Sequence, residues 1–376
     1  MIHGDNLILL VIFLIFCIAA VIQLFYWLWF YLAPYFSKAI EIGSRKEPVS
    51  VIICARNEAD NLRNFLPSVL EQDYPSYEVI IVNDCSEDSS DDVLGQFIMQ
   101  YPHLRISSIN KDPKFTHNKK FAQFIGIKAA INEILVFTDA DCQPESEKWL
   151  SIMSSNFDDK TDFVLGYGGY LNEKGLLNKY IRSDSMFIAM QYIGMALRKI
   201  PYMGVGRNLA YRRSMFFRNK GFGVHNHIMS GDDDLFVNSV ASKSDTRVEF
   251  RPGSHTRSVP SSSVAGFIKQ KQRHFTTAKF YKPWHKVLLF LEPFSRILFY
   301  AMFAVIVSVL YLWPYAIALF GLRLIVQIVV LALVQKRLNE RGLLIFSIIF
   351  DIFSPVINGV LYFSSFSNRS GSNTWK

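Results

Sequence analysis

Phe137-Thr-Asp-Ala-Asp-Cys142 places two carboxylates, one residue apart, directly after the apolar run 134–137. Because that run is short, β-branched and bounded by polar residues, it predicts a buried strand whose carboxyl end carries Asp139 and Asp141 into a crevice. Side chains at i and i+2 of an extended segment point the same way, so both carboxylates can face one ligand. Oxygen ligands of this kind suit Mg²⁺ or Mn²⁺. An isolated Asp-x-Asp pair is usually part of a solvated loop, so its neighbours decide the interpretation.

Predicted strands and helices alternate up to this pair. The strands are expected at 48–54, 78–82, 105–109 and 134–137, with helices between them at about 58–72, 89–101 and 119–130. Such alternation implies an α/β fold with a parallel sheet, which binds ligands outside the carboxyl ends of its strands. The candidate site residues at those ends are Arg56, Glu58, Asp84, Asp139 and Asp141. Each alone is an ordinary turn former, but together at one sheet edge they predict a binding site.

A glycine-rich phosphate loop is absent from the sequence, which contains neither G-x-x-x-x-G-K nor G-x-G-x-x-G. A diphosphate would therefore be held mainly by a metal ion and by cationic side chains. Lys119 opens the predicted helix 119–130, where its side chain can reach the same edge of the sheet.

Long apolar segments flank this central region. Residues 7–32 carry no charge and exceed the roughly 20 residues that cross a bilayer. Segment 1–36 is therefore predicted to be a retained membrane anchor rather than a cleaved signal. Three further membrane helices are predicted within 294–366.

The net charge is +8, and the basic residues cluster beside the apolar segments, at Lys38, Arg45 and Lys46 and again between 269 and 286. Basic clusters next to membrane spans place the central domain on the cytoplasmic side of the inner (plasma) membrane. No nucleic-acid recognition motif accompanies them, so we expect anionic lipid rather than nucleic acid as their partner.

Further motifs follow the aspartate pair. They are Pro201-Tyr-Met-Gly204, Gly206-Arg-Asn-Leu-Ala-Tyr-Arg-Arg213, Gly231-Asp-Asp-Asp-Leu235 and Gln270-Lys-Gln-Arg-His274. The last motif lies in a basic amphipathic helix predicted within 261–286, a pattern typical of a membrane surface. With the strand-end residues, these motifs resemble the family-2 glycosyltransferases of GT-A fold, in their membrane-embedded branch. The resemblance covers 49–274 by motif and the flanking helices by layout.

The resemblance implies a GT-A domain, a Rossmann-like nucleotide-diphospho-sugar transferase fold, over 47–260, inserted between membrane helices. It implies that Arg56, Glu58 and Asp84 contact the nucleoside of a nucleotide-sugar donor. Lys119 matches the lysine of the family's G-K-x-x-x-L-N-x-G-I element, although its Gly and Leu are Asn118 and Gln123 here. The metal motif matches Asp139 and Asp141, with Asp139 also on the donor side, and the acceptor side matches Gly206, Arg207 and Asn208.

Transfer of a sugar to a hydroxyl group requires a carboxylate base, and the Gly-Asp-Asp-Asp motif supplies candidates. By resemblance the second carboxylate, Asp233, is the base, with Asp232 beside it. Adjacent carboxylates also suit a helix N-terminus, where they cap free N–H groups. We expect both roles to hold, with Asp232 as the cap and Asp233 reaching the acceptor.

Gln270-Lys-Gln-Arg-His274 is similar to the family's Q-x-x-R-W motif, with His274 in place of Trp. Gln270 and Arg273 are expected on the donor side, with Arg273 as a phosphate clamp. Loss of the broad Trp face that would stack on an acceptor sugar argues against processive synthesis. The alternative interpretation of this segment is a membrane-surface helix and nothing more.

The sequence thus predicts an inverting, metal-dependent transferase that moves a sugar from a nucleotide donor, expected to be a UDP-sugar, to a lipid or lipid-linked acceptor. A processive polysaccharide synthase of the same family is the alternative. A membrane scaffold that binds nucleotide-sugar without turnover is a third reading, which a degenerate metal pair or a missing base would favour; the sequence has neither.

Two charges stand inside predicted membrane helices. Arg323 lies nine residues beyond Pro314 and Asp351 eight beyond Leu343, so helical rise puts them about 14 and 12 Å from opposite faces. These depths nearly coincide in a hydrocarbon core about 30 Å thick. We expect an ion pair, which an exchange of the two charges would restore; a polar acceptor pocket that includes Gln327 and Asn358 is the alternative.

Overall fold

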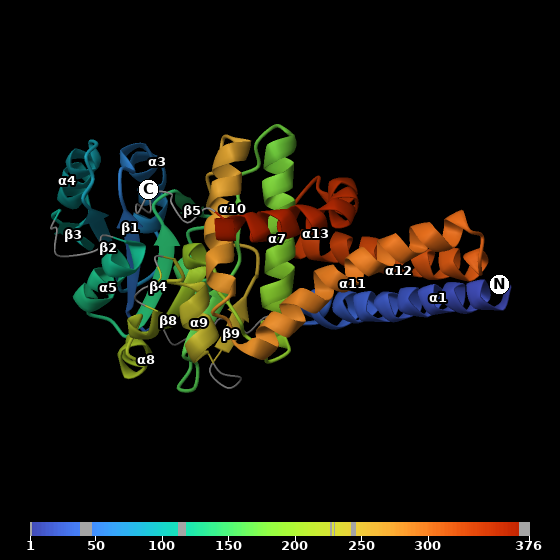
Figure 1. Cartoon of the computed structure of the whole chain (residues 1–376). Helices are drawn as coiled ribbons and strands as arrows, with labels where there is room; N and C mark the ends of the chain where they lie inside the picture. Colours follow the sequence, from blue (N-terminus) through green and yellow to red (C-terminus); the bar gives the residue numbers. More distant parts are fainter. Residues whose placement is uncertain are drawn as a thin grey trace.

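The computed structural model describes residues 2–37, 47–111, 118–225, 228, 230–241 and 246–367. An α/β domain forms one end of the molecule and a bundle of long helices forms the other, with the N-terminus at the tip of the bundle (Figure 1). The predicted basic residues Lys38, Arg45 and Lys46 lie outside the described residues.

The first half of the α/β domain follows the predicted order. Its elements are β1 (Val49–Ala55), α3 (Ala59–Leu70), β2 (Tyr77–Asp84), α4 (Ser90–Gln100), β3 (Leu104–Ile109), α5 (Lys119–Ala129) and β4 (Ile134–Asp139). The four strands pair in parallel, with Ile52 opposite both Ile80 and Phe137. β1 and β4 are almost wholly buried because helices cover both faces of the sheet.

The second half adds strands that the alternating pattern does not predict. Its elements are β5 (Cys142–Pro144), α6 (Trp149–Ser154), β6 (Phe163–Gly166), β7 (Gly168–Tyr170), α7 (Leu176–Leu197), η2 (Gly206–Asn208), β8 (Leu209–Arg212), α8 (Arg213–Arg218), η3 (Gly223–His225), α9 (Asp234–Val240), β9 (Thr246–Glu249) and β10 (Thr256–Ser258). The larger sheet has the order β3-β2-β1-β4-β8-β6-β9, and a smaller one has the order β5-β10-β7.

The parallel pairing predicted for the first four strands is confirmed, but the larger sheet as a whole is mixed. β8 runs antiparallel to β4 and β6, with Leu209 opposite both Phe137 and Leu165. The chain reaches β8 through η2, which lies at the carboxyl end of β4. Because the strand starts at that edge of the sheet, it must run in the opposite direction.

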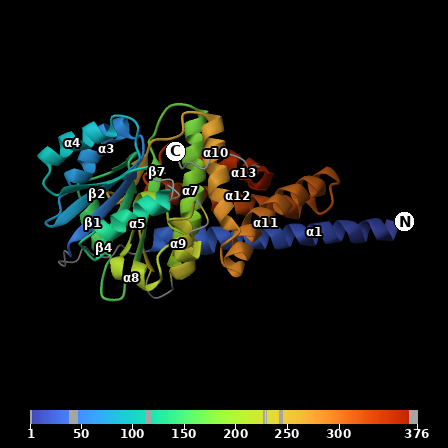
Figure 2. The ribbon, with the colours of Figure 1, turned by 60° about the vertical axis from the view of Figure 1, so that its left-hand side comes forward.

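Two long helices, α7 and α10 (Val264–Ala278), run across the direction of the membrane helices (Figures 1 and 2). Lys271 of α10 donates to both carboxylate oxygens of Asp184 of α7, each at 2.8 Å. The helix α10 matches the predicted amphipathic segment. The pattern of α7 gives little sequence signal because the helix is buried on most of its sides.

Among the described residues, four helices are long and apolar enough to cross a membrane, as the sequence predicts. The first comprises α1 (Ile2–Phe25), the π-helix η1 (Tyr26–Tyr31) and α2 (Ala33–Phe36), and the others are α11 (Pro283–Ser308), α12 (Trp313–Arg337) and α13 (Leu344–Ser367). α11 begins eleven residues before the predicted start at 294, so it overlaps the end of the segment predicted as the surface helix.

The expected pair between Arg323 and Asp351 is present, with Nη2 and Oδ2 2.8 Å apart. Asp351 also accepts from Arg296 at 3.0 Å, and Arg296 binds Glu292 at 2.7 Å. Gln23 of α1 accepts a further hydrogen bond from Arg323 at 2.9 Å. The network thus joins all four membrane helices and contains equal numbers of positive and negative charges.

This network changes the expected result of exchanging the two charges. Arg323→Asp should reduce accumulation of the protein, because it leaves one arginine for three carboxylates, and an unpaired charge at this depth costs about 3 kcal/mol or more. Adding Asp351→Arg should restore accumulation only in part, because the new arginine meets Arg296. The neutral double variant Arg323→Gln with Asp351→Asn, which keeps the Arg296–Glu292 pair, should accumulate better than either exchange variant.

The measurement is the amount of full-length protein in purified membranes, with Lys269→Gln, an exposed charge loss on α10, as the control. Full recovery in the exchanged pair would show that Arg296 does not contribute to the site of Asp351.

Candidate active site

The carboxyl edge of the larger sheet brings four charged side chains together. Lys119, at the start of α5, lies with Nζ 2.7 Å from Oδ1 of Asp139 at the end of β4. The same Nζ is 3.6 Å from Oδ2 of Asp232. The N–H of Gly206 in η2 donates to Oδ2 of Asp233 at 2.6 Å. Four segments separated in sequence therefore form one polar cluster.

Helix capping places two of these residues. Asn118 caps α5 by accepting from the N–H of Phe121 at 2.9 Å, which leaves Lys119 as the first helical residue. Asp233 caps α9 by accepting from the N–H of Asp234 at 2.7 Å. The expectation that Asp232 is the cap was therefore wrong: the chain turns one residue later.

Gly231 makes this late turn possible. Its φ is +94°, a conformation that side chains disfavour, and an added Cβ would lie 2.5 Å from Cδ1 of Leu235. Asp232 follows this turn and is buried, whereas Asp233 is partly exposed. Of the two predicted catalytic carboxylates, Asp233 is the one a ligand can reach more readily.

The charged groups of the cluster shift one another's pKa values. Burial alone would lower the pKa of Lys119, but the carboxylates of Asp139, Asp232 and Asp233 raise that pKa well above its ordinary value. Burial would raise the pKa of Asp139, but Lys119 outweighs burial and holds that pKa below its ordinary value, with smaller contributions from Arg207 and Arg273. The cluster therefore contains a permanent cation and an ionised aspartate.

Three other aspartates have raised pKa values, because burial makes the largest contribution to each. Burial, helped by the neighbouring charge of Asp139, raises the pKa of Asp141. Burial also raises the pKa of Asp232, despite the opposing effect of Lys119. Burial and Asp233 raise the pKa of Asp234 to about 7. Asp234 accepts hydrogen bonds from Thr277 and from Tyr281, the latter at 2.6 Å, so it anchors α10 to α9.

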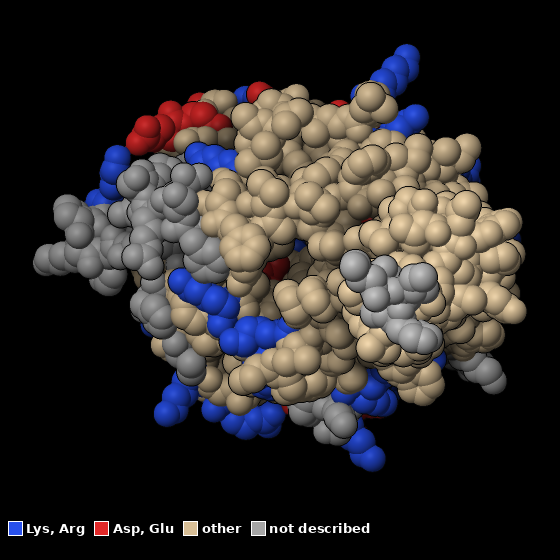
Figure 3. Space-filling view, turned by 45° about the vertical axis from the view of Figure 1, so that its right-hand side comes forward, with Lys and Arg blue, Asp and Glu red and all other residues tan. Residues whose placement is uncertain are grey.

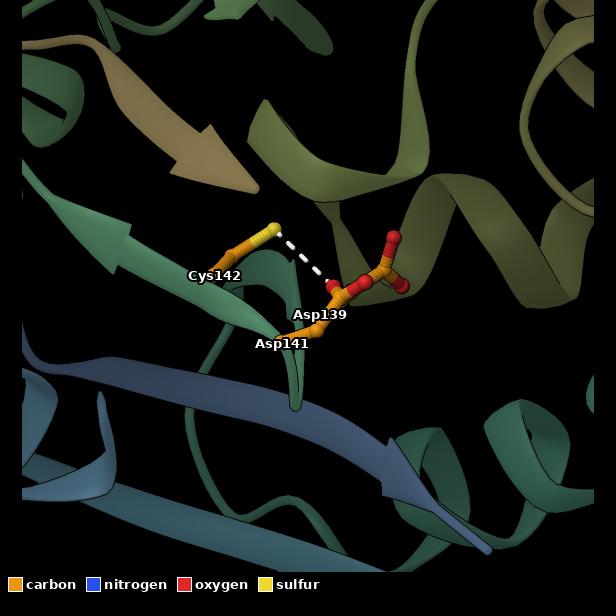
Figure 4. Close-up of side chains that lie close together, drawn as sticks. All are labelled: Asp139, Asp141 and Cys142. Carbon is orange, nitrogen blue, oxygen red and sulfur yellow. Dashed lines mark hydrogen bonds between the residues drawn. The ribbon is translucent and has the colours of Figure 1, made fainter. Parts of the chain in front are cut away.

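Ligand atoms of Asp139, Asp141 and Cys142 all lie within 4.8 Å of one another. Figure 4 shows the side chains of Asp141 and Cys142 directed toward each other, with Asp139 beside them. Burial raises the pKa of the Cys142 thiol well above its ordinary value, so the thiolate that binds soft metals is disfavoured. The two carboxylates remain, and their oxygens fit Mg²⁺ or Mn²⁺.

The predicted nucleoside residues stand at the neighbouring strand ends. Asn57 adopts a left-handed φ of +54°, and its N–H donates to Ser86 at 2.9 Å, which joins the turns after β1 and β2. Glu58 is buried and accepts from Asn61 at 2.6 Å. Asp84 ends β2 but has no exposed surface.

Two features beside these turns suit the binding of a ligand: a cavity, and a nitrogen atom without a hydrogen bond among the described residues. The Nε atom of Arg56 is buried and makes no hydrogen bond within the described residues. A cavity of about 220 Å³ opens at the ends of β2 and β3, and its lining includes Asn83, Asp91 and Ser108.

Two predicted acceptor residues of η2, Arg207 and Asn208, differ in burial and in contacts. Arg207 donates to Gly168 O at 2.8 Å and to Ser185 Oγ at 3.0 Å, and it lies over the Tyr170 ring. Asn208 is fully buried, and its amide bonds Trp149, Tyr167 and Ser254. Asn208 therefore has no surface for an acceptor, and the acceptor-side role predicted for it gives way to a structural one.

The α10 motif faces the same region. Gln270 donates to the hydroxyl of Tyr170 at 3.2 Å, while Arg273 and His274 are exposed. The surface is hollowed on the side seen in Figure 3, with an acidic side chain at the bottom of the hollow and basic side chains mainly on one side of it. Sequence reasoning missed Tyr170, Ser185 and Asp184, which hold this arrangement. A signal for the last was available, since a charge within the apolar α7 segment has to be paired.

Residues 50–218 match the model of the family described as Glycosyl transferase family 2. Glycosyltransferase AglE of Haloferax volcanii is 36% identical over 104 residues, which cover 27% of this chain and 33% of that protein. Probable glycosyltransferase YdaM of Bacillus subtilis is 29% identical over 182 residues, or 46% of this chain and 42% of that protein. The chain thus spans less than half the length of either relative.

A solved structure shares the fold along most of the chain. It is the mannosyltransferase PcManGT from Pyrobaculum calidifontis in complex with GDP-Man and Mn²⁺. The two chains are 18% identical, with a TM-score of 0.57, over 92% of this chain and 99% of that one. The likeness establishes the GT-A fold of this chain.

We expect Asp141→Asn to abolish metal-dependent binding of a nucleoside diphosphate while the protein still folds and inserts. The substitution removes a charge from the strand end and leaves the packed core unchanged. UDP and GDP binding, each with and without Mn²⁺, can be measured by isothermal titration calorimetry on the purified full-length chain. An unchanged Mn²⁺-dependent affinity would contradict the assignment of Asp141 as a metal ligand.

Proposed function

Residues 50–218 belong to glycosyl transferase family 2, and on this premise we propose an inverting, metal-dependent transfer of a sugar from a nucleotide donor to a membrane acceptor. The observation that supports it most is the cluster of Lys119, Asp139, Asp232 and Asp233 at one sheet edge. That cluster combines a fixed cation, a candidate metal ligand and a reachable carboxylate.

In this proposal the donor binds across the strand ends. Arg56 and Glu58 contact the nucleoside, whereas Asp84, which has no exposed surface, supports the end of β2 beneath it. Lys119 and Arg273 contact the diphosphate, with Gln270 beside them. A Mg²⁺ or Mn²⁺ ion held by Asp139 and Asp141 would neutralise charge on the departing diphosphate. Arg273 contributes, less than Lys119, to the lowered pKa of Asp139, which supports its place on this side of the site.

Asp233 acts as the general base. It accepts the proton of the acceptor hydroxyl as the oxygen of that hydroxyl bonds to the anomeric carbon. The bond from that carbon to the diphosphate oxygen breaks, and the nucleoside diphosphate leaves with the electron pair. Attack from the face opposite the leaving group inverts the anomeric centre. Hydrogen bonds from Gly206 and Asp234 hold the Asp233 carboxylate in one orientation for this step.

The donor is proposed to be a UDP-sugar, on the resemblance of Val82-Asn-Asp84 to the family segment that contacts the uracil or the ribose. The mannosyltransferase that shares the fold is in complex with GDP-Man, so a GDP-sugar is the alternative to include in a donor screen. The screen would follow release of nucleoside diphosphate by membranes that contain the protein.

The acceptor is proposed to be a lipid or a lipid-linked saccharide at the cytoplasmic face of the inner membrane. Gln272 of α10 donates to Ser364 of α13 at 2.9 Å, so the basic helix beside the site packs directly on a membrane helix. Its arginine and lysine side chains suit an anionic headgroup. A non-catalytic scaffold is disfavoured because both the carboxylate pair and the candidate base are in place.

Asp233→Asn is expected to retain donor binding and to lose transfer, because a base acts only on the acceptor hydroxyl. A loss of about a thousandfold in kcat would correspond to about 4 kcal/mol of barrier. Radiolabelled sugar transfer reports kcat, and calorimetry with the nucleoside diphosphate reports binding. Asp92→Asn, an exposed position on α4 outside the cavity lining and away from the base, is the matched control. Simultaneous loss of binding and turnover would mean that Asp233 is structural.

Product length distinguishes single transfer from the alternative of processive synthesis. His274 is exposed at the position where the family has a stacking Trp, so we expect products with one added sugar or very few at any donor concentration. Mass spectrometry of extracted products measures the distribution. A ladder of long saccharides would favour a polysaccharide synthase.

A further inference from the structure

The connection between α12 and α13 contacts the α/β domain through a buried carboxylate, that of Glu340. Asn339, two residues after the end of α12 at Arg337, has a left-handed φ of +53°, and the N–H of Glu340 donates to Gln335 O at 2.8 Å. This hydrogen bond is typical of a terminated helix and fixes the backbone at Glu340. The side chain of Glu340 is 0% exposed.

Three residues of the α/β domain satisfy this carboxylate. Arg182 of α7 donates to Oε2 from Nε at 3.0 Å and from Nη2 at 2.7 Å. Tyr167 donates its hydroxyl to Oε1 at 2.9 Å, and Nη1 of Arg257 donates to the same oxygen. A buried carboxylate with this many donors is held in a single position. Removing its charge leaves the buried Arg182 without its carboxylate partner and leaves Arg257 paired with Glu145 alone, at 2.6 Å.

A glycine in the small sheet leaves space for the contact between Arg257 and Glu340. An added Cβ at Gly169 of β7 would lie 2.2 Å from Nη1 of Arg257 and 3.0 Å from Oε1 of Glu340. The strand therefore requires glycine, since any side chain would displace the pair.

Strand β10 connects the contact between Glu340 and Arg257 to Asp141, the proposed metal ligand. Arg257 lies on β10, which pairs with β5 so that Ser258 is opposite Cys142. The N–H of Val259 donates to the backbone oxygen of Asp141 at 3.1 Å. Arg257 also donates to Leu338 O at 3.0 Å, next to Glu340. One strand of three residues thus separates the membrane hairpin from the backbone of Asp141.

We infer that Glu340 is a positioning residue, which couples the α12–α13 hairpin to the Asp141 end of the β5–β10 pair and so sets the geometry of the metal ligands. The inference rests on the proposed function, because it takes Asp141 as a ligand. It deepens that function by giving the membrane helices a part in forming the site.

Glu340→Gln in the full-length protein tests the coupling. We expect the dissociation constant for Mn²⁺ alone, measured by electron paramagnetic resonance, to rise about tenfold or more, as for other supports of metal ligands. In transfer assays the Mn²⁺ concentration for half-maximal rate should rise equally, and saturating Mn²⁺ should restore most of kcat. Glu78→Gln is the matched control. It removes a buried carboxylate that pairs with Arg105 at the opposite end of β2, so it should lower thermal stability without changing Mn²⁺ affinity.

Tyr167→Phe is the milder variant, which decides the question if Glu340→Gln does not accumulate. It removes one donor to Glu340 and should weaken Mn²⁺ binding in the same direction by a smaller factor. Mn²⁺ affinity equal to wild type in the folded variants, alongside loss of affinity in Asp141→Asn, would overturn the coupling and leave the proposed function standing. Equal affinity in wild type and Asp141→Asn would overturn the metal assignment, and the coupling with it.

Discussion

The ion pair between Lys119 and Asp139 is the interaction on which the site depends. Asp139, Asp232 and Asp233 converge from two segments, and three carboxylates this close would repel one another without a cation among them. Lys119 supplies that cation from the first residue of α5, and its position follows from the Asn118 cap. The excess of negative charge that remains is what a divalent cation would bind.

Charge balance also organises the molecule away from the site. Arg323, Arg296, Glu292 and Asp351 form a neutral network between the membrane helices. Glu340 forms a second buried network, with two arginines of the α/β domain. A buried ion pair adds little net stability over apolar packing, but losing one partner is costly. Such pairs therefore fix how the helices and the domain sit against one another.

The proposed reaction draws on both parts of the chain. The sheet edge carries the carboxylates, whereas α10 carries Gln270 and Arg273 and is itself anchored on three sides, by Asp184, Asp234 and Ser364. Two of these anchors are carboxylates of the α/β domain, and the third is a hydroxyl on a membrane helix. The candidate site thus lies where the larger sheet meets the long apolar helices.

Local pattern in the sequence determined the order of the first seven elements of the α/β domain, from β1 to β4. It also determined the strand-end position of Asp139 and the four membrane helices, because periodicity and apolar length are properties of short segments. It also predicted the pair of Arg323 and Asp351, since depth in a bilayer follows from helical rise. Contacts between distant segments decided the rest. The antiparallel β8, the buried amide of Asn208, the cap at Asp233 and the burial of Glu340 each depend on a partner far along the chain, and no local pattern specifies which partner the fold brings near.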